Sequence, residues 1–285
     1  MPLCAPRPTL TDMRKVKGQR AWAIARALVV LLLLAIFMQQ PLTRPARSMP
    51  PQVWLITSGT GSRIAFDAPA IASTLLAPGR SIVLGFPVGG GAPTALSWAS
   101  EAAFQLAIAN KWIPPQVTTV MYDPENWPST PRDERIDPVA AMNSFSASAR
   151  ALGYRVIITP HPSLVTVPGG RCTVRPGEPI EDAYVRCDIA GQAAKVADIV
   201  ETQGQMLETD PGAYGRFVSA TAAQARAANP HVLVLSGLST NFTDSPVALY
   251  RAWLSVRDVV DGHYLAAPHG LRQDVMIAFL RLLPS

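Results

Sequence analysis

The chain has 285 residues, a formal net charge of +5 at pH 7 and 48% hydrophobic residues, so it has room for one large domain or two small ones. Five cations between residues 14 and 26 (Arg14, Lys15, Lys17, Arg20 and Arg26) equal the whole net charge. No basic run with interleaved aromatic residues occurs after them, which argues against a nucleic-acid partner.

The N-terminal region has the pattern of an export signal. Residues 21–38, AWAIARALVVLLLLAIFM, are apolar except for Arg26 and follow a basic stretch, so residues 1–38 are predicted to be a signal peptide or a signal-anchor helix. The unbroken apolar run is short for a membrane span, yet no small-residue cleavage site follows it. Both alternatives stay open, and an uncleaved segment would make the membrane a partner. In either case the rest of the chain is expected to be extracytoplasmic.

A proline-rich polar stretch at 39–52 is expected to be a linker. Beyond it, short β-branched apolar runs alternate with longer helical patterns. Strands are predicted at 53–59, 81–88, 118–124, 155–162, 196–204, 231–239 and 259–268. Helices are predicted at 92–111, 137–153, 210–230, 245–258 and 271–283. The nearly continuous apolarity of the strands is typical of parallel sheets that are covered on both faces.

Strands that alternate with helices, or with gaps of helix length, favour an α/β fold. We predict a (β/α)8 barrel of the TIM type over residues 53–285, in which the eighth unit is short and near the C-terminus or the barrel is incomplete. An open doubly wound sheet is the alternative. Its nucleotide-binding loop is poorly matched by SGTGSR at 58–63, which lacks a third glycine. No cofactor is predicted.

Two cysteines, Cys172 and Cys187, form the only pair in the part of the chain expected to be exported. In an oxidising compartment they are predicted to form a disulfide, which would stabilise the fold by roughly 3 kcal/mol on a chain-entropy estimate. They make a poor zinc set without a further CxxC or histidine pair, and no metal site is predicted. The segment 163–190 around them is expected to overhang the active-site cleft.

Polar side chains gather where the predicted strands end, which is where barrel enzymes carry their working residues. The candidate carboxylates are Asp123, Glu125 and Glu201. The candidate substrate contacts are Tyr122, Trp127, His161, Gln203, Asn241, His263 and Tyr264. Glycoside hydrolysis needs one protonated acid and a second carboxylate as nucleophile or base, and aromatic rings stack on sugars.

Structural roles remain open for the same residues. Asp123 and Glu125 can accept backbone N–H groups of a long loop, and Glu201 can pair with an arginine. His161 lies between two prolines and can cap a turn. Glu134 and its acidic neighbours are expected to be solvated or to cap a helix.

The element YDPENW at 122–127, together with the barrel order, resembles carbohydrate-active barrels. Its Asp-x-Glu spacing is similar to the chitinase-like family, in which the Glu is the general acid and the Asp two positions earlier assists. That resemblance implies that Glu125 is the acid, Asp123 the assisting carboxylate and Tyr264 a substrate aromatic. The sequence departs from the family because TTVM replaces its longer acidic run and Pro124 occupies the middle position.

The region 53–283 also resembles uncharacterised exported barrel proteins of high-GC bacteria that share a YDPE-x-W-x-x-TP element. The leading hypothesis is therefore an exported barrel that acts on a glycan through Glu125 and Glu201, whose strands are separated by one strand. One alternative is a non-catalytic carbohydrate-binding or structural barrel. Another is a metal-dependent hydrolase with His161, His263, Glu201 and Asp123 as ligands.

Overall fold

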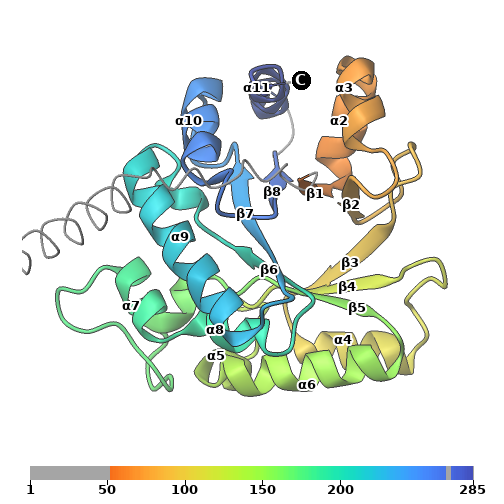
Figure 1. The fold of residues 1–285 in the computed structure, drawn as a ribbon. Coiled ribbons are helices and arrows are strands. Elements are labelled where there is room, and N and C mark those ends of the chain that lie inside the picture. The colour runs from red at the N-terminus through yellow and green to blue at the C-terminus, as the bar shows by residue number, and fades with distance from the viewer. Residues whose placement is uncertain (1–51, 268–270, 285) are drawn as a thin grey trace, which may run out of the picture. The chain divides into compact units, whose positions relative to one another are not determined.

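The computed structural model describes residues 52–267 and 271–284. Eight parallel strands, hydrogen-bonded in chain order, close into a barrel (Figure 1). The strands are β1 (Val53–Thr57), β2 (Ser81–Leu84), β3 (Thr94–Trp98), β4 (Thr119–Tyr122), β5 (Arg155–Ile158), β6 (Ile199–Thr202), β7 (Leu233–Ser239) and β8 (Gly262–Ala266). The predicted TIM-type fold is confirmed.

Helices lie between successive strands except between β2 and β3, and two short 3-10 helices follow β5 and β6. The α-helices are α2 (Ser58–Asp67), α3 (Pro69–Leu75), α4 (Glu101–Ala109), α5 (Arg132–Ile136), α6 (Pro138–Ala151), α7 (Ile180–Arg186), α8 (Ile189–Ala194), α9 (Pro211–Ala228), α10 (Pro246–Val256) and α11 (Leu271–Leu280). The 3-10 helices are η1 (Pro162–Thr166) and η2 (Gln205–Leu207). None of the helices within the described ranges is long and apolar enough to cross a membrane. The predicted signal or anchor and the linker, apart from Gln52, lie outside those ranges.

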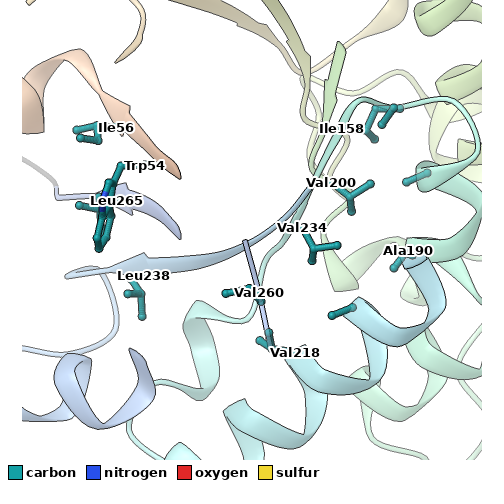
Figure 2. Close-up of a cluster of buried hydrophobic side chains, with 14 of the residues drawn as sticks. Trp54, Ile56, Ile158, Ala190, Val200, Val218, Val234, Leu238, Val260 and Leu265 are labelled. Carbon is teal, nitrogen blue, oxygen red and sulfur yellow. The ribbon is translucent and has the colours of Figure 1, made fainter. Parts of the chain in front are cut away.

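Each strand contributes to two cores because successive side chains point to opposite faces. The core inside the barrel consists of Leu55, Ile82, Ala95, Met121, Ile157, Ile199 and Leu235. A larger core lies between the barrel and its helices, and Figure 2 shows part of it, with Val200 and Val234 of the barrel near Ala190 and Val218 of α8 and α9. Burial on both faces explains why the strands lack polar alternation.

The eighth strand lies elsewhere than predicted. It is β3, Thr94–Trp98, which falls inside the stretch predicted as a helix from 92 to 111, and it pairs with β2 and β4. The helix in this stretch begins only at Glu101, because Ser100 caps it by accepting from the Ala103 N–H. The expectation of a short C-terminal unit or an incomplete barrel is therefore wrong. Asp123 and Glu125 follow the fourth strand, and Glu201 lies on the sixth.

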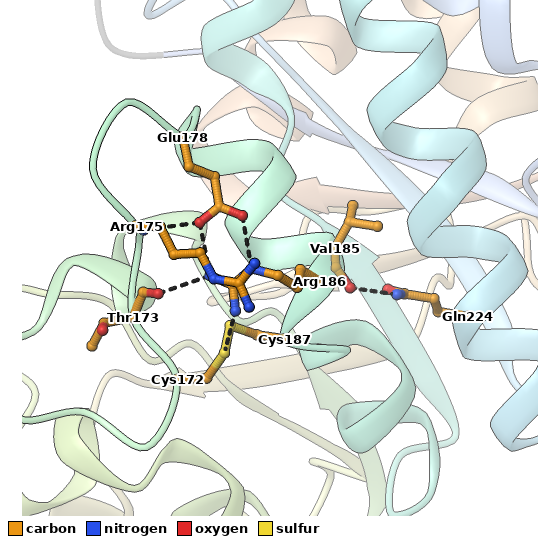
Figure 3. The surroundings of a disulfide bond; sticks show 8 residues. All are labelled: Cys172, Thr173, Arg175, Glu178, Val185, Arg186, Cys187 and Gln224. Carbon is orange, nitrogen blue, oxygen red and sulfur yellow. Dashed lines mark hydrogen bonds and ion pairs between the residues drawn. A yellow bond between two sulfur atoms is a disulfide. The ribbon is translucent and has the colours of Figure 1, made fainter.

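The predicted disulfide between Cys172 and Cys187 is present, with a Cα–Cα distance of 5.8 Å. It ties the loop before α7 to the end of that helix (Figure 3). Arg186 adds a second cross-link, because its guanidinium pairs with Glu178 and donates to the carbonyl of Thr173. The segment is thereby fixed at both of its ends.

Candidate active site at the barrel mouth

A cavity of about 270 Å³ opens at the carboxyl ends of the strands, where barrel enzymes hold their active sites. Its lining residues are Met121, Asp123, Glu125, Trp127, His161, Glu201, Gln203, Gln205, Met206, Ser239, Asn241, Phe242, Tyr264 and Ala266. The structure thus brings together all three candidate carboxyl groups and five of the seven predicted substrate contacts. Met121 and Tyr264 join the cavity to the core inside the barrel.

Asp123 is held by contacts from β3 and from the residues that follow β5 and β6. Its backbone N–H donates to the Trp98 carbonyl at 2.9 Å, which extends the pairing of β3 with β4. Its Oδ1 accepts from the Thr159 hydroxyl at 2.8 Å and from the Gln203 amide at 2.7 Å. Burial raises the pKa of Asp123 to about 6, although both hydrogen bonds act to lower that pKa. Asp123 is therefore mostly ionised at neutral pH.

Glu125 has the opposite charge state at neutral pH. Burial raises the pKa of its carboxyl to about 8, and the charge of Asp123 adds to this rise. Its Oε2 is buried without a hydrogen-bond partner, and only 7% of the residue is exposed. The backbone N–H of Glu125 donates to the Thr130 hydroxyl, which fixes the loop after β4. A carboxyl in this environment keeps its proton at neutral pH.

Glu201 projects into the cavity from β6 and is 1% exposed. Burial raises its pKa well above the usual range, and the charges of Asp123 and Glu125 raise it further. Its Oε1 is buried without a hydrogen-bond partner. Within residues 52–267 and 271–284, no arginine or lysine forms an ion pair with any of these three carboxyls, so the structural alternative of a salt bridge at Glu201 does not hold.

Two predicted substrate contacts, Tyr122 and His263, lie outside the cavity. The Tyr122 hydroxyl donates to Glu134 at 2.8 Å, and its ring stacks on Phe145. The His263 imidazole contacts the Ser236 hydroxyl at 2.8 Å and is fully buried. Both side chains point outward because they alternate with inward-pointing neighbours on their strands. The prediction that they contact substrate is corrected accordingly.

His161 has both of the roles considered for it. It lines the cavity, and its Nδ1 accepts from the Ser163 N–H at 3.0 Å, which caps η1. Burial lowers the pKa of the imidazole to about 4, so His161 is uncharged at neutral pH. It is therefore a polar lining group without a charge.

Two exposed aromatic side chains flank the acidic cavity. Trp127, from the loop after β4, is 57% exposed, and Phe242, from the loop after β7, is 54% exposed. Sequence reasoning identified Trp127 but missed Phe242 and Met206, because loop residues have no periodicity that reveals their direction. The signal available for Phe242 was its place directly after the polar end of β7. Aromatic faces of this kind stack on sugar rings and other flat apolar surfaces.

Glu208 is a buried acid that sequence reasoning also missed. One of its carboxyl oxygens accepts from the Ser239 N–H, and burial raises its pKa to about 9. Ser239 in turn accepts from the Asn241 N–H, which shapes the loop that carries Asn241 to the cavity. Glu208 thus supports the cavity wall from behind.

Two further expectations are corrected by the geometry. No residue of the segment 163–190 lines the cavity, because α7 packs against η1 and α9 instead of over the barrel mouth. The four ligands of the alternative metal site are not assembled either, since His263 points away from the other three. In the part of the chain that the structure describes, no group of three or more His, Cys, Asp or Glu is arranged to hold a metal ion.

No protein family model and no curated protein matches the chain. Solved structures of similar shape include a class V chitinase from Pseudomonas fluorescens Pf-5, with 12% identity, 81% of this chain and 100% of that chain covered, and a TM-score of 0.44. A chitinase from Chromobacterium violaceum ATCC 12472 shares 13% identity over 82% of this chain and 100% of its own, with a TM-score of 0.42. An archaeal fructose-1,6-bisphosphate aldolase shares 13% identity over 81% and 92%, with a TM-score of 0.48. At these identities the likeness lies in the barrel fold alone.

Proposed function

We propose that the protein hydrolyses a glycosidic bond outside the cytoplasm. The observation that carries this proposal is the meeting of three carboxyl groups, without a basic partner among the residues that the structure describes, in a cavity flanked by two exposed aromatic rings. Acid-catalysed glycoside cleavage requires carboxyl groups in different charge states at one site. The disulfide between Cys172 and Cys187 supports an oxidising, extracytoplasmic location.

The charge states favour a division of roles between Asp123 and Glu125. Glu125, which keeps its proton at neutral pH, donates it to the oxygen of the leaving group. Asp123, ionised and fixed by Thr159 and Gln203, stabilises the positive charge that develops on the sugar ring. Glu125, ionised by its proton transfer, then takes a proton from the water that attacks the sugar carbon, which completes the hydrolysis and restores its acid form. Glu201 is the third carboxyl and lies deepest of the three, where it contacts the bound sugar.

The remaining lining groups suit a carbohydrate better than a carbonyl substrate. Trp127 and Phe242 offer stacking surfaces, and Gln205 and Asn241 offer amides for hydroxyl groups. Schiff-base chemistry would need a lysine amine, and no lysine is among the lining residues.

Hydrolysis is tested by measuring new reducing ends from a panel of oligosaccharides with purified protein. We expect Glu125→Gln and Asp123→Asn each to lower kcat by about 10² to 10⁴-fold, the usual contribution of an acid or a charge-stabilising group. Glu181→Gln on α7, which removes an acid outside the cavity, should leave kcat unchanged.

The competing function is a carbohydrate-binding barrel without turnover. It would be favoured if wild-type protein bound an oligosaccharide tightly, as measured by calorimetry, and released no reducing ends between pH 5 and pH 8. Retention of full kcat by Glu125→Gln would contradict the assigned acid.

A further inference from the structure

The side chains that line the cavity include acids but no arginine or lysine. All of its ionisable lining groups are carboxyls, an uncharged imidazole and a phenol, and no arginine or lysine is among them. Two arginines on neighbouring segments are engaged elsewhere. Arg135 donates to Asn126 Oδ1 at 2.8 Å, and Arg272 donates to the backbone carbonyls of Thr240 and Asn241. Among residues 52–267 and 271–284, no arginine or lysine therefore supplies a cation to the three carboxyls.

Two carboxyl oxygens in the cavity also lack a hydrogen-bond donor. They are Glu125 Oε2 and Glu201 Oε1, and both residues are more than nine-tenths buried. Buried polar atoms are normally paired, because leaving one unpaired costs about 1 to 3 kcal/mol. His161, the one imidazole in the lining, already uses its Nδ1 for the Ser163 N–H. No described residue pairs with these two oxygens, and none offsets the negative charge of ionised Asp123, so an occupant with N–H donors and a positive charge would complement the cavity.

The charge and the hydrogen-bond donors of each type of sugar limit which sugars can occupy the cavity. A uronic acid or a sulfated sugar would bring a second negative charge next to Asp123 with no cation to offset it. A neutral sugar supplies hydroxyl donors but no charge. An amino sugar with a free amine supplies both, because its ammonium group has several N–H donors and one positive charge.

We propose that the substrate is a glycan of amino sugars that keep their free amine, and that its ammonium group pairs with Glu201. Glu201 is the more deeply buried of the two carboxyls with an unpaired oxygen, which leaves Glu125 free to protonate the leaving group. This inference rests on the proposed glycan site and specifies its substrate class. Burial raises the pKa of Glu201 well above its usual range, and a paired ammonium group would lower it again, so the pairing should release a proton to solvent as the carboxyl ionises.

Calorimetric titration tests the inference without turnover. Oligomers of glucosamine and of galactosamine are compared with the N-acetylated oligomers of the same length and linkage, at pH 7, in two buffers of different ionisation enthalpy. The amino oligomers should bind at least about tenfold more tightly, the effect of one charge-assisted hydrogen bond. Only they should release a proton, seen as a buffer-dependent enthalpy. The other titratable groups that line the cavity are Asp123, Glu125, His161 and Tyr264.

A pair of variants assigns the effect to one residue. Glu201→Gln should remove both the preference for the free amine and the release of the proton. Glu181→Gln, outside the cavity, should keep both. If Glu201→Gln does not fold, the wild-type comparison of amino with N-acetylated oligomers still decides the question.

The inference is overturned if N-acetylated oligomers bind as tightly as the free amines, or if Glu201→Gln keeps the preference. Its failure is distinct from failure of the proposed hydrolysis. Cleavage of neutral oligomers without a preference for amines would support the proposed hydrolysis and contradict the proposed amino-sugar specificity. Preferred binding of amino oligomers that are never cleaved would support the amino-sugar specificity and contradict the proposed hydrolysis.

Discussion

Asp123 and Glu125 are two positions apart, yet only Asp123 receives hydrogen bonds on its carboxylate from Thr159 and Gln203. The two residues therefore set different limits on activity. Activity should fall below about pH 6 as Asp123 becomes protonated, and above about pH 8 as Glu125 loses its proton. We expect a bell-shaped profile of kcat/KM against pH, measured from initial rates between pH 4.5 and pH 9.5.

Thr159→Val provides a sharper test of this assignment. It removes a donor that favours ionised Asp123, so the pKa of Asp123 should rise and the acidic limb should move to higher pH. The alkaline limb should stay in place. Thr221→Val, on α9 outside the cavity, serves as the control. An acidic limb that stays in place in Thr159→Val would show that another group sets it.

Gly237 lies where a side chain would fill the space used by the site. A Cβ at this position would overlap the Gln205 amide and Glu201 Oε1. Gly237→Ala should therefore displace both side chains and lower kcat/KM by about 10²-fold, the scale of an ångström-sized misplacement. Gly212→Ala in the first turn of α9 meets no such overlap and should keep kcat/KM near wild type. Equal kcat/KM for the two variants would mean that the Glu201 position is not critical.

At the scale of single elements, the short helix α5 holds Glu134 against the start of α4. Its Glu134 accepts from the Ser100 hydroxyl, the N–H groups of Glu101 and Ala102, and the Tyr122 hydroxyl. The expected capping acid thus caps α4, a helix some 30 residues earlier in the chain, where its charge also favours the helix N-terminus. This contact binds the α4 end to β4 directly beneath Asp123.

Loss of this cap should lower the free energy of unfolding, because four donors share the Glu134 carboxylate. We expect Glu134→Gln to lower the free energy of unfolding by about 2 kcal/mol, within the range for a buried charged acceptor. Tyr122→Phe, which removes one of the four donors, should cost about 1 kcal/mol. Urea unfolding measures both, with Glu181→Gln as the reference for removal of an acid without such contacts. A Glu134→Gln midpoint equal to that of wild type would contradict the assigned role.

Seven of the eight strands could be predicted because burial on both faces makes them continuous apolar runs. β3 was missed because TALSW is short, only its first two residues are buried, and a helix follows after two residues. Because both faces of each strand are buried, the sequence does not reveal which side chains face the barrel interior and which face the helices. Nothing in the sequence tells whether Tyr122 or Met121 faces the barrel interior, so Tyr122 was placed in the site, while Asp123, Glu125 and Glu201 were placed correctly at the barrel mouth. The position of Phe242 beside the cavity depends on a loop conformation, which the periodicity of apolar residues in the sequence does not predict.

At the scale of the whole molecule, buried acids make stability depend on pH. The pKa values of Glu125, Glu201 and Glu208 are raised by burial, to about 8 and about 9 for the first and last. The folded state therefore keeps protons that the unfolded chain loses above about pH 4.5. The free energy of unfolding should fall as pH rises from 7.5 to 9, a range in which the buried His161 and His263 are uncharged in the folded state and almost fully uncharged in the unfolded chain.

Urea midpoints at several pH values between pH 7.5 and pH 9 measure this fall. Each retained proton contributes a slope of about 1.4 kcal/mol per pH unit at most. Glu208→Gln should flatten the slope by about one proton, because its carboxyl no longer titrates. A midpoint that stays constant or rises over this range would contradict the raised pKa values.

The barrel is not uniformly joined around its circumference. β2 with β3 and β5 with β6 share two register partners each, whereas the other neighbouring pairs share at least four. These two seams divide the wall into an arc of three strands, β3 to β5, and an arc of five. Asp123 and Glu125 belong to the first arc, and Glu201 belongs to the second.

Gln203 spans one of these seams, since its amide reaches from the end of β6 to Asp123 and to the Thr159 carbonyl. At the barrel mouth, this amide therefore helps to set the spacing between the acid in one arc and the residue proposed to bind the sugar in the other. Amide hydrogen exchange should be fastest along the two seams, because fewer pairings oppose local opening there. Breathing of the shell would then widen or narrow the site without moving any loop.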